Sequence, residues 1–201
     1  MKCAVIGGSH LAKGLTDGQR SAIEGMGVWL AHEGIQLLTG SCWGYPLLVA
    51  KACAQAGGVS VGYSPAHNAE EDREVYGHPQ EGFTRHVFLD AGHEGAYARL
   101  LMRSVPLVDD ADIVVSLEGN WGTLMEQTAA IVCGKPLVVL EPSGGASVVF
   151  RRIYPTLAAE NRNNYGDQVA FVQTIRQVEQ EILSVRDTGS LTDACVIRRA
   201  Q

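Results

Sequence analysis

The sequence is poor in the features that mark membrane, secreted or disordered proteins. Aromatic residues make up 6% of the 201 positions and charged residues 19%, whereas hydrophobic residues make up 46%. No apolar run approaches the roughly 20 residues that a membrane-spanning helix needs. The apolar start of the chain reaches Gly7 and Gly8 too early for a secretory signal peptide. We therefore expect a globular protein of the cytoplasm with no membrane contact.

The sequence also lacks the residue spacings that mark a metal site or a set of disulfide bonds. The five cysteines are scattered and contain no Cys-x-x-Cys pair. The spacing of His67, His78, His86 and His93 does not match a metal site. We expect reduced cysteines, no bound metal and no resident cofactor. Cys42, in a Gly-Ser-Cys-Trp-Gly turn, is the cysteine that can lie beside a ligand, although no neighbouring base indicates a nucleophile.

Positive charge is scarce relative to negative charge. Lys and Arg total 16 against 22 Asp and Glu, which gives a formal net charge of -6 and a pI near 5.5. Because binding to a nucleic-acid backbone needs clustered Lys and Arg, this balance argues against a general nucleic-acid-binding surface. A small anionic ligand stays compatible with it, since one pocket can be positive on an acidic protein.

Short apolar segments alternate with helical segments along the chain. Strands are expected at 2–6, 35–39, 59–63, 85–89, 113–117 and 137–140. Helices are expected at 17–33, 46–56, 94–108, 124–133, 148–159 and 174–185. The polar stretch between them, 64–84, is expected to cross the edge of the sheet. This alternation predicts an α/β fold: one Rossmann-like domain over residues 1–185, with a mainly parallel sheet and helices on both faces, and a C-terminal tail at 186–201.

Glycine-bearing turns follow the first, second and fifth expected strands. The dinucleotide fingerprint Gly-x-Gly-x-x-Gly and the P-loop motif are both absent, so the turns predict neither an ordinary NAD site nor an NTPase. In a Rossmann-like sheet they lie together at the carboxyl edge, where ligands bind. Glycine lets the backbone approach an anion, and a helix N-terminus attracts it. The expected phosphate-binding residues are Gly7, Gly8, Ser9, Gly40, Ser41, Gly119, Asn120, Trp121, Gly122 and Thr123.

The third of these turns carries a more specific resemblance. Residues 119–126, Gly-Asn-Trp-Gly-Thr-Leu-Met-Glu, resemble the Pro-Gly-Gly-x-Gly-Thr-x-x-Glu signature of the lonely-guy phosphoribohydrolases, long misnamed lysine decarboxylases. Arg103 precedes Asp112 by nine residues, and that family places its arginine similarly before an Ala-Asp pair that begins a strand. The resemblance covers residues 3–140. The wider superfamily also includes molybdenum-cofactor carrier proteins and DNA-processing proteins.

The resemblance implies hydrolysis of the N-glycosidic bond of a nucleoside 5'-monophosphate, giving a free base and ribose 5-phosphate. By the same resemblance, Glu126 is the catalytic carboxylate near C1 of the sugar, and Arg103 orients Glu126 or clamps the nucleotide. Three positions depart from the family pattern. Glu118 replaces the Pro, Asn120 replaces the second Gly, and Ser104 replaces a Lys.

Other interpretations of these residues remain open. Taken singly, Arg103 and Glu126 are of the kind that commonly forms a solvated helix surface. Trp121 can stack on a base, pack in the core or contact a second subunit. His67 and Asn68 can line a base pocket.

The alternative function is a non-catalytic nucleotide or phosphorylated-cofactor binding protein, such as a molybdenum-cofactor carrier. A DNA-binding protein is disfavoured by the acidic balance. The expected partners are therefore a small phosphate-bearing molecule and a second copy of the chain. We expect a homodimer or higher homo-oligomer that uses the helices at 46–56 and 124–132.

Overall fold

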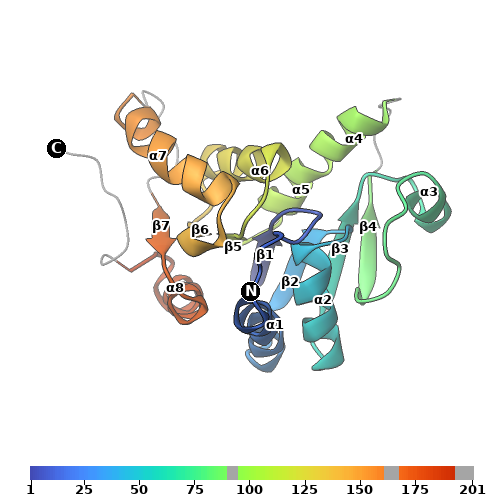
Figure 1. Ribbon diagram of the computed structural model, residues 1–201, viewed down its shortest axis with the longest axis horizontal. Coiled ribbons are helices and arrows are strands. Elements are labelled where there is room, and N and C mark those ends of the chain that lie inside the picture. The colour runs from blue at the N-terminus through green and yellow to red at the C-terminus, as the bar shows by residue number, and fades with distance from the viewer. Residues whose placement is uncertain (90–94, 161–167, 193–201) are drawn as a thin grey trace.

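The computed structural model describes residues 1–89, 95–160 and 168–192, and within them a seven-stranded sheet has the order β4-β3-β2-β1-β5-β6-β7 (Figure 1). All neighbouring strands are parallel. The strands are β1 (Lys2–Ile6), β2 (Gln36–Gly40), β3 (Ser60–Ser64), β4 (Arg85–Phe88), β5 (Ile113–Ser116), β6 (Leu137–Leu140) and β7 (Val169–Val172). The expected α/β Rossmann-like fold is confirmed, and the turns after β1, β2 and β5 are neighbours.

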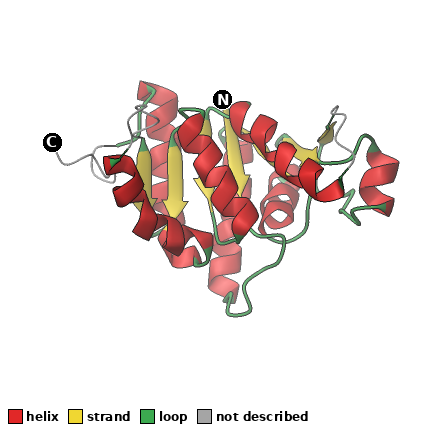
Figure 2. Ribbon diagram, turned by 90° about the horizontal axis from the view of Figure 1, so that it is seen from above, coloured by secondary structure: helices red, strands yellow, loops and turns green. Residues whose placement is uncertain are grey.

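Helices cover both faces of the sheet (Figures 1 and 2). They are α1 (Asp17–His32), α2 (Tyr45–Gln55), α3 (Ala69–Glu74), α4 (Ala96–Met102), α5 (Ser104–Asp109), α6 (Trp121–Val132), α7 (Ala146–Ala159) and α8 (Ile175–Thr188), with a 3-10 turn η1 (Glu141–Ser143). In the central strand β1, Cys3 and Val5 pack toward α1, α2 and α8, whereas Ala4 and Ile6 pack toward α5, α6 and α7. Both faces are buried, which explains the continuous apolar runs of the strands.

The helix expected at 94–108 is divided into α4 and α5, which meet at Arg103. Pro106 explains the division, because it has no N–H to donate to the carbonyl of Met102 one turn earlier. Two elements escaped prediction altogether. α3 lies inside the polar stretch 64–84, capped by Asn68, and β7 contributes only four residues to the sheet.

The last helix continues past its expected end at residue 185. α8 reaches Thr188, Leu191 is buried, and the backbone N–H of Thr192 donates to Glu181 Oε2 at 2.7 Å. These contacts hold the first part of the expected tail against the domain. The described residues do not include His93, Glu94 or the rest of the tail at 193–201 with Cys195. They also exclude residues 161–164, which their Asn-rich sequence predicts as a loop.

One of the two helices expected at a subunit interface belongs to the core. α2 packs on α1 so closely that a Cβ added to Gly27 of α1 would lie 2.5 Å from the carbonyl oxygen of Val49. Val49, Ala50 and Cys53 are fully buried. The exposed apolar side chains gather instead on α4, α6 and α7, and they include Tyr97, Leu101, Trp121, Val132, Val149, Ile153 and Leu157.

Candidate functional site

A cavity of about 360 Å³ lies beside the carboxyl ends of β1, β2 and β5. The turns after β1 and β5 form one side of it, and α4, α5 and α6 form the other. The predicted site residues that line it are Gly7, Gly8, Ser9, Arg103, Asn120, Gly122, Thr123 and Glu126. Gly40, Ser41, Gly119 and Trp121 are not among its lining residues, and each has a different position, described below.

The first and third glycine turns are in direct contact. The N–H of Gly8 donates to the carbonyl of Glu118 at 2.7 Å. A Cβ added to Gly119 would lie 2.0 Å from Thr123 Oγ1 and 3.0 Å from the backbone nitrogen of Gly8. Only glycine fits there, so Gly119 supports the cavity wall from behind and lets the two turns meet.

The N-terminus of α6 opens into this cavity. Its first backbone N–H groups have no carbonyl one turn earlier to bond. Asn120 occupies the N-cap position, and its side chain makes no capping bond within the described residues. The amides of Gly122 and Thr123 therefore point, with the positive end of the helix dipole, into a space lined by glycine. This arrangement suits a phosphate group.

Arg103 reaches the cavity from the junction between α4 and α5. Its Nη1 donates to the carbonyl of Tyr63 at 3.1 Å, and the guanidinium lies directly over Gly40. A Cβ at Gly40 would come within 1.9 Å of Nη1, so this glycine makes room for the arginine. Arg103 Nε has no hydrogen-bond partner within the described residues. Arg103 lines the cavity, so its positive charge acts on an anionic ligand there.

Glu126 lies one turn along α6 from Gly122, and its side chain is almost buried, with 5% of the residue exposed. The Ser104 hydroxyl donates to Glu126 Oε1 at 2.8 Å. Burial raises the pKa of the Glu126 carboxyl, and the Arg103 charge and the Ser104 hydrogen bond offset this only in part. Among the described residues, the Ser104 bond to Oε1 is the side-chain hydrogen bond of Glu126, and its Oε2 stays available for chemistry in the cavity that Glu126 lines.

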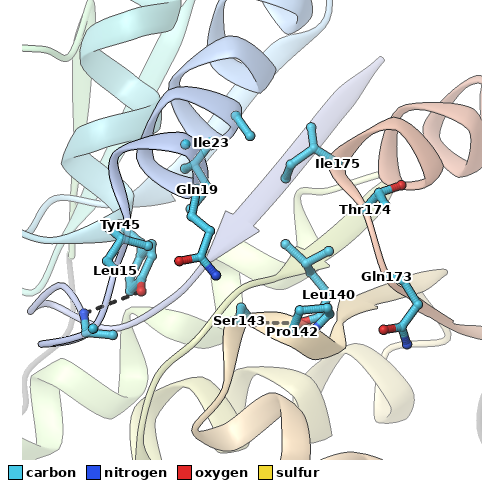
Figure 3. A pocket seen from close by; sticks show the side chains of 14 residues that line it. Leu15, Gln19, Ile23, Tyr45, Leu140, Pro142, Ser143, Gln173, Thr174 and Ile175 are labelled. Atoms are coloured by element: carbon cyan, nitrogen blue, oxygen red, sulfur yellow. Dashed lines mark hydrogen bonds between the residues drawn. The ribbon is translucent and has the colours of Figure 1, made fainter.

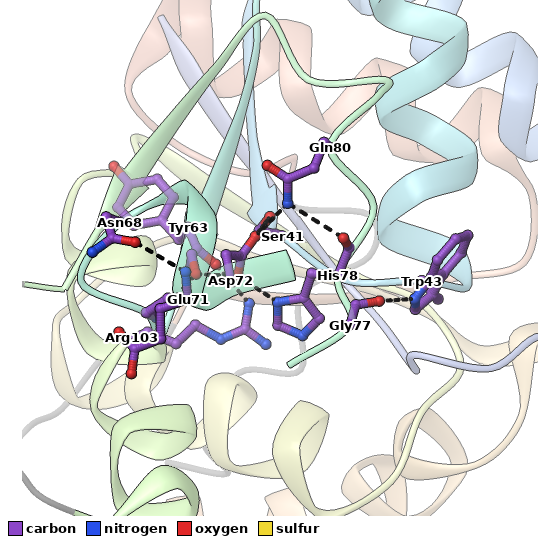
Figure 4. Close-up of polar contacts among 12 residues, drawn as sticks. Ser41, Trp43, Tyr63, Asn68, Glu71, Asp72, Gly77, His78, Gln80 and Arg103 are labelled. Atoms are coloured by element: carbon purple, nitrogen blue, oxygen red, sulfur yellow. Dashed lines mark hydrogen bonds and ion pairs between the residues drawn. The ribbon is translucent and has the colours of Figure 1, made fainter. Parts of the chain in front are cut away.

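Ser41 takes part in a different structure, a buried carboxylate cluster next to the cavity (Figure 4). The Ser41 hydroxyl donates to Asp72 Oδ2 at 3.3 Å. The Asp72 carboxylate also accepts hydrogen bonds from the Ser64 hydroxyl, from His78 Nδ1 at 2.8 Å and from Gln80 Nε2 at 3.1 Å. These bonds fasten the crossing segment at 64–84 to the ends of β2 and β3.

The pKa of Asp72 reflects this cluster. Burial by itself raises the pKa of Asp72, but the bonds from His78, Ser64 and Gln80 outweigh it and hold the pKa below its ordinary value. The cluster was not predicted, because its members are spread over 40 positions and carry no shared motif. The acidic run at 70–72 was the one sequence signal near it.

Of the other residues that the sequence suggested near a ligand, one lines the cavity. Cys42 does line the cavity, and burial raises the pKa of its thiol against the opposing charge of Arg103. Trp121 is 84% exposed at the start of α6 and does not pack in the core. His67 binds the Leu89 carbonyl and Asn68 caps α3, so neither lines the cavity.

The outer wall of the cavity was missed by sequence reasoning. It consists of Tyr97, Leu100 and Leu101 of α4 with Met125 of α6. The spacing of Tyr97 and Leu101, four residues apart, puts them on one side of α4. That pattern was the available signal. These residues were predicted only as part of the helix at 94–108, because nothing in the sequence says that this side faces a ligand.

The described residues were also compared with the requirements of a metal site and of a membrane-spanning helix. No cluster of three or more His, Cys, Asp or Glu side chains suited to a metal ion is found in residues 1–89, 95–160 and 168–192. Over the same residues, no helix has the length and apolar character needed to cross a membrane.

Comparison with solved structures supports the fold. The structural-genomics target TM1055 is 25% identical over 92% of this chain and 99% of its own, with a TM-score of 0.68. The molybdenum cofactor binding protein of Rippkaea orientalis is 20% identical over 92% of this chain and 96% of its own, with a TM-score of 0.68. DNA processing protein A of Helicobacter pylori is 15% identical over 92% of this chain and 80% of its own, with a TM-score of 0.62.

Sequence comparison assigns the family. No curated protein matches the chain. The model of the SLOG cluster4 family matches residues 1–179, nearly the whole described fold, including the glycine turns, Arg103 and Glu126. The chain therefore belongs to the SLOG cluster4 family.

Proposed function

We propose that this protein is a nucleoside 5'-monophosphate phosphoribohydrolase. The observation that carries the proposal is that a nearly buried carboxyl, Glu126, shares one cavity with the open N-terminus of its own helix. A phosphate held by the amides of Gly122 and Thr123 fixes the ribose within reach of a residue one turn further along α6. Remote binding energy at the phosphate then serves to orient the reacting sugar.

The cavity offers separate places for the three parts of such a substrate. The phosphate belongs at the glycine turns, where amides and the helix dipole converge. Arg103, which lines the cavity, balances the negative charge. The base belongs against the apolar side formed by Tyr97, Leu101 and Met125, because aromatic bases bind to apolar and aromatic side chains.

The reaction breaks the C1'–N bond and adds water across it. The bonding pair leaves with the base, which takes up a proton, while water supplies the hydroxyl that appears on C1' of ribose 5-phosphate. The sugar becomes cation-like as the bond breaks. An ionised Glu126 stabilises that cation or takes a proton from the attacking water, as carboxylates do in glycoside hydrolysis.

The direct test is to incubate the protein with AMP, CMP, GMP and UMP and to measure free base and ribose 5-phosphate by chromatography. Release of both products in equal amounts from at least one nucleotide is expected. The matching nucleosides, which lack the phosphate, are the control and are expected to react far more slowly. Tight binding of a nucleotide without any base release would reject the hydrolase assignment.

The pH dependence of base release provides a second prediction, which concerns Ser104. If ionised Glu126 is the reacting form, the rate falls as the pH drops through its pKa, and this limb lies above the ordinary glutamate pKa of 4.5. Ser104→Ala removes a hydrogen bond that favours the ionised form. The acid limb of kcat is therefore expected to move to higher pH.

Val105→Ala, which changes the exposed neighbour of Ser104, serves as the matched control and is expected to leave the acid limb in place. A profile for Ser104→Ala that coincides with the wild-type profile would show that the Ser104–Glu126 contact does not govern the reaction. A shift to lower pH would contradict the assignment of Glu126 as the group that must be ionised.

A carrier of a phosphorylated cofactor is the second candidate. It is favoured by the likeness to the molybdenum cofactor binding protein of Rippkaea orientalis and the molybdenum cofactor carrier protein of Chlamydomonas reinhardtii, which is 17% identical over 93% of this chain and 98% of its own, with a TM-score of 0.65. The open amides of α6 suit a terminal phosphate on either kind of ligand. Mass spectrometry of the ligand that co-purifies with the protein separates the two candidates.

We further propose that the protein forms a homodimer through the exposed apolar side chains of α4, α6 and α7. Val149, Ile153 and Leu157 follow each other at intervals of four on α7, which gives one continuous apolar stripe. Tyr97 and Leu101 extend the apolar surface along α4 to the mouth of the cavity. Sedimentation velocity is expected to give twice the 21.5 kDa chain mass, and Leu157→Asp to shift it to the monomer.

A further inference from the structure

A second cavity, of about 470 Å³, lies beside the segment that joins β1 to α1 (Figure 3). It is bounded by this segment, by the first turns of α1, by η1 after β6 and by the start of α8. None of its lining residues lines the cavity that holds Glu126. It is therefore a separate site, and the proposed hydrolysis makes no use of it.

The walls of this second cavity are mainly apolar and include no charged side chain. Leu15, Ile23, Leu140, Pro142 and Ile175 line it together with Gln19, Ser143, Gln173 and Thr174. Within the described residues, no Asp, Glu, Lys, Arg or His side chain lines it. Moving a charged group into such a place is costly without a partner, so the cavity selects against ions. Its size falls in the range typical of small-molecule sites.

The two helix ends at this cavity differ from the end of α6. The N-termini of α1 and α8 are both closed by capping boxes, in which Thr16 pairs with Gln19 and Thr174 pairs with Gln177. These side chains already satisfy amides that a phosphate would otherwise bind. The cavity is therefore not a second phosphate site, although two helices begin beside it.

Two lining residues nevertheless offer directional contacts. Gln19 Oε1 accepts hydrogen bonds from the N–H and the hydroxyl of Thr16. The amide nitrogen of Gln19 has no hydrogen bond to any described residue and faces the cavity in Figure 3. It is thus a free donor. Tyr45 lies at the base of the cavity, where 1% of the residue is exposed, and its hydroxyl accepts from the Ala12 N–H at 3.4 Å.

We propose that this second cavity binds an uncharged aromatic molecule of one or two rings that carries a hydrogen-bond acceptor. The apolar side chains of Leu15, Pro142 and Ile175 take the flat body, because aromatic rings pack well on apolar surface. The Gln19 amide donates to the acceptor. The lack of any charged lining residue excludes the phosphorylated substrates of the first cavity.

Coumarin, which is neutral, bicyclic and carries a carbonyl acceptor, is a suitable probe. Its binding to the full chain is measured by calorimetry and by ligand-observed NMR. Coumarin is expected to bind, and coumarin-3-carboxylate, which adds a negative charge to the same rings, to bind at least about tenfold more weakly. Failure of coumarin to bind in the millimolar range, or equal binding of the carboxylate, would overturn the proposal.

A matched pair of variants on α1 locates the binding. Ala22 lines the second cavity and is exposed, so Ala22→Phe fills the space without disturbing the core. The neighbouring Ser21 is also exposed but does not line it, and Ser21→Phe is the control. Ala22→Phe is expected to weaken coumarin binding at least about tenfold, and Ser21→Phe to leave it unchanged.

Inorganic phosphate separates this proposal from the proposed function. Both variants are expected to bind phosphate as the wild-type protein does, because the first cavity is untouched. Displacement of coumarin by phosphate, or retention of coumarin by Ala22→Phe, would place the aromatic ligand in the first cavity and contradict the second site. Loss of nucleotide hydrolysis alone has no bearing on these measurements.

Discussion

Replacing Glu126 with Gln is expected to slow base release about 1000-fold, while the protein still folds and still binds its nucleotide. The amide has nearly the shape of the carboxyl and keeps an oxygen that accepts the Ser104 hydroxyl bond. It lacks the negative charge that stabilises a cation-like sugar. The phosphate contacts at Gly122 and Thr123 are untouched. The loss should therefore appear in kcat, and nucleotide affinity measured by calorimetry should stay the same.

Glu181→Gln is the matched control for this experiment. Glu181 is another buried helical glutamate, and it binds the backbone and hydroxyl of Thr192 on the far side of the sheet. Its replacement is expected to lower stability without a specific effect on kcat. If Glu126→Gln and Glu181→Gln reduce base release equally, the loss reflects general damage, and Glu126 has no special role.

Asp72→Ala is expected to destabilise the protein by about 3 kcal/mol and to lower Tm by about 10 °C. The substitution removes the acceptor of Gln80 and leaves the donors of Ser41, Ser64 and His78 buried around an empty acceptor position. Buried donors without an acceptor are among the costliest changes that a single mutation makes. Urea denaturation followed by circular dichroism gives the free energy of unfolding. Glu70→Ala, an exposed acid on the same helix, is expected to change it little.

The pH dependence of this effect has a definite sign. Because the pKa of Asp72 is lower in the folded protein than its ordinary value of 3.8, the carboxylate stabilises the fold at pH values above 3.8. That contribution is lost as the pH falls through the lower, folded-state pKa. The stability difference between wild type and Asp72→Ala should thus be full at pH 7 and shrink below pH 3.8. A difference that grows on acidification would contradict the role assigned to this carboxylate.

Local patterns in the sequence were sufficient for most of the fold. Runs such as Ile113–Ser116 and the glycine turns that follow them specify alternating strands and helices, and parallel pairing follows from that alternation. The elements that were missed are short. β7 has four residues, and its place at the edge of the sheet depends on pairing with β6 rather than on its own propensity. α3 depends on its Asn68 cap within a polar segment.

The candidate site was predictable to the extent that backbone geometry determines it. The grouping of Gly8, Gly122 and Thr123 follows from strand order, and the positions of Arg103 and Glu126 follow from the family resemblance. Contacts between side chains from distant segments were not accessible in this way. The Ser104–Glu126 bond joins α5 to α6 across 22 positions, and no local pattern marks Ser104 as a partner of Glu126. Likewise, nothing local to Ser41 marks it as a partner of Asp72.

The central place of β1 in the sheet has a consequence for biosynthesis. This strand pairs on one side with β2, which follows within the next 40 residues, and on the other with β5, whose Ser116 aligns with Ile6. A nascent chain can complete the first pairing well before the ribosome has delivered the second partner. During that interval the growing polypeptide presents a bare strand edge, a surface on which chains aggregate. Chaperone protection is therefore expected to matter between the emergence of β2 and the emergence of β5 from the ribosome.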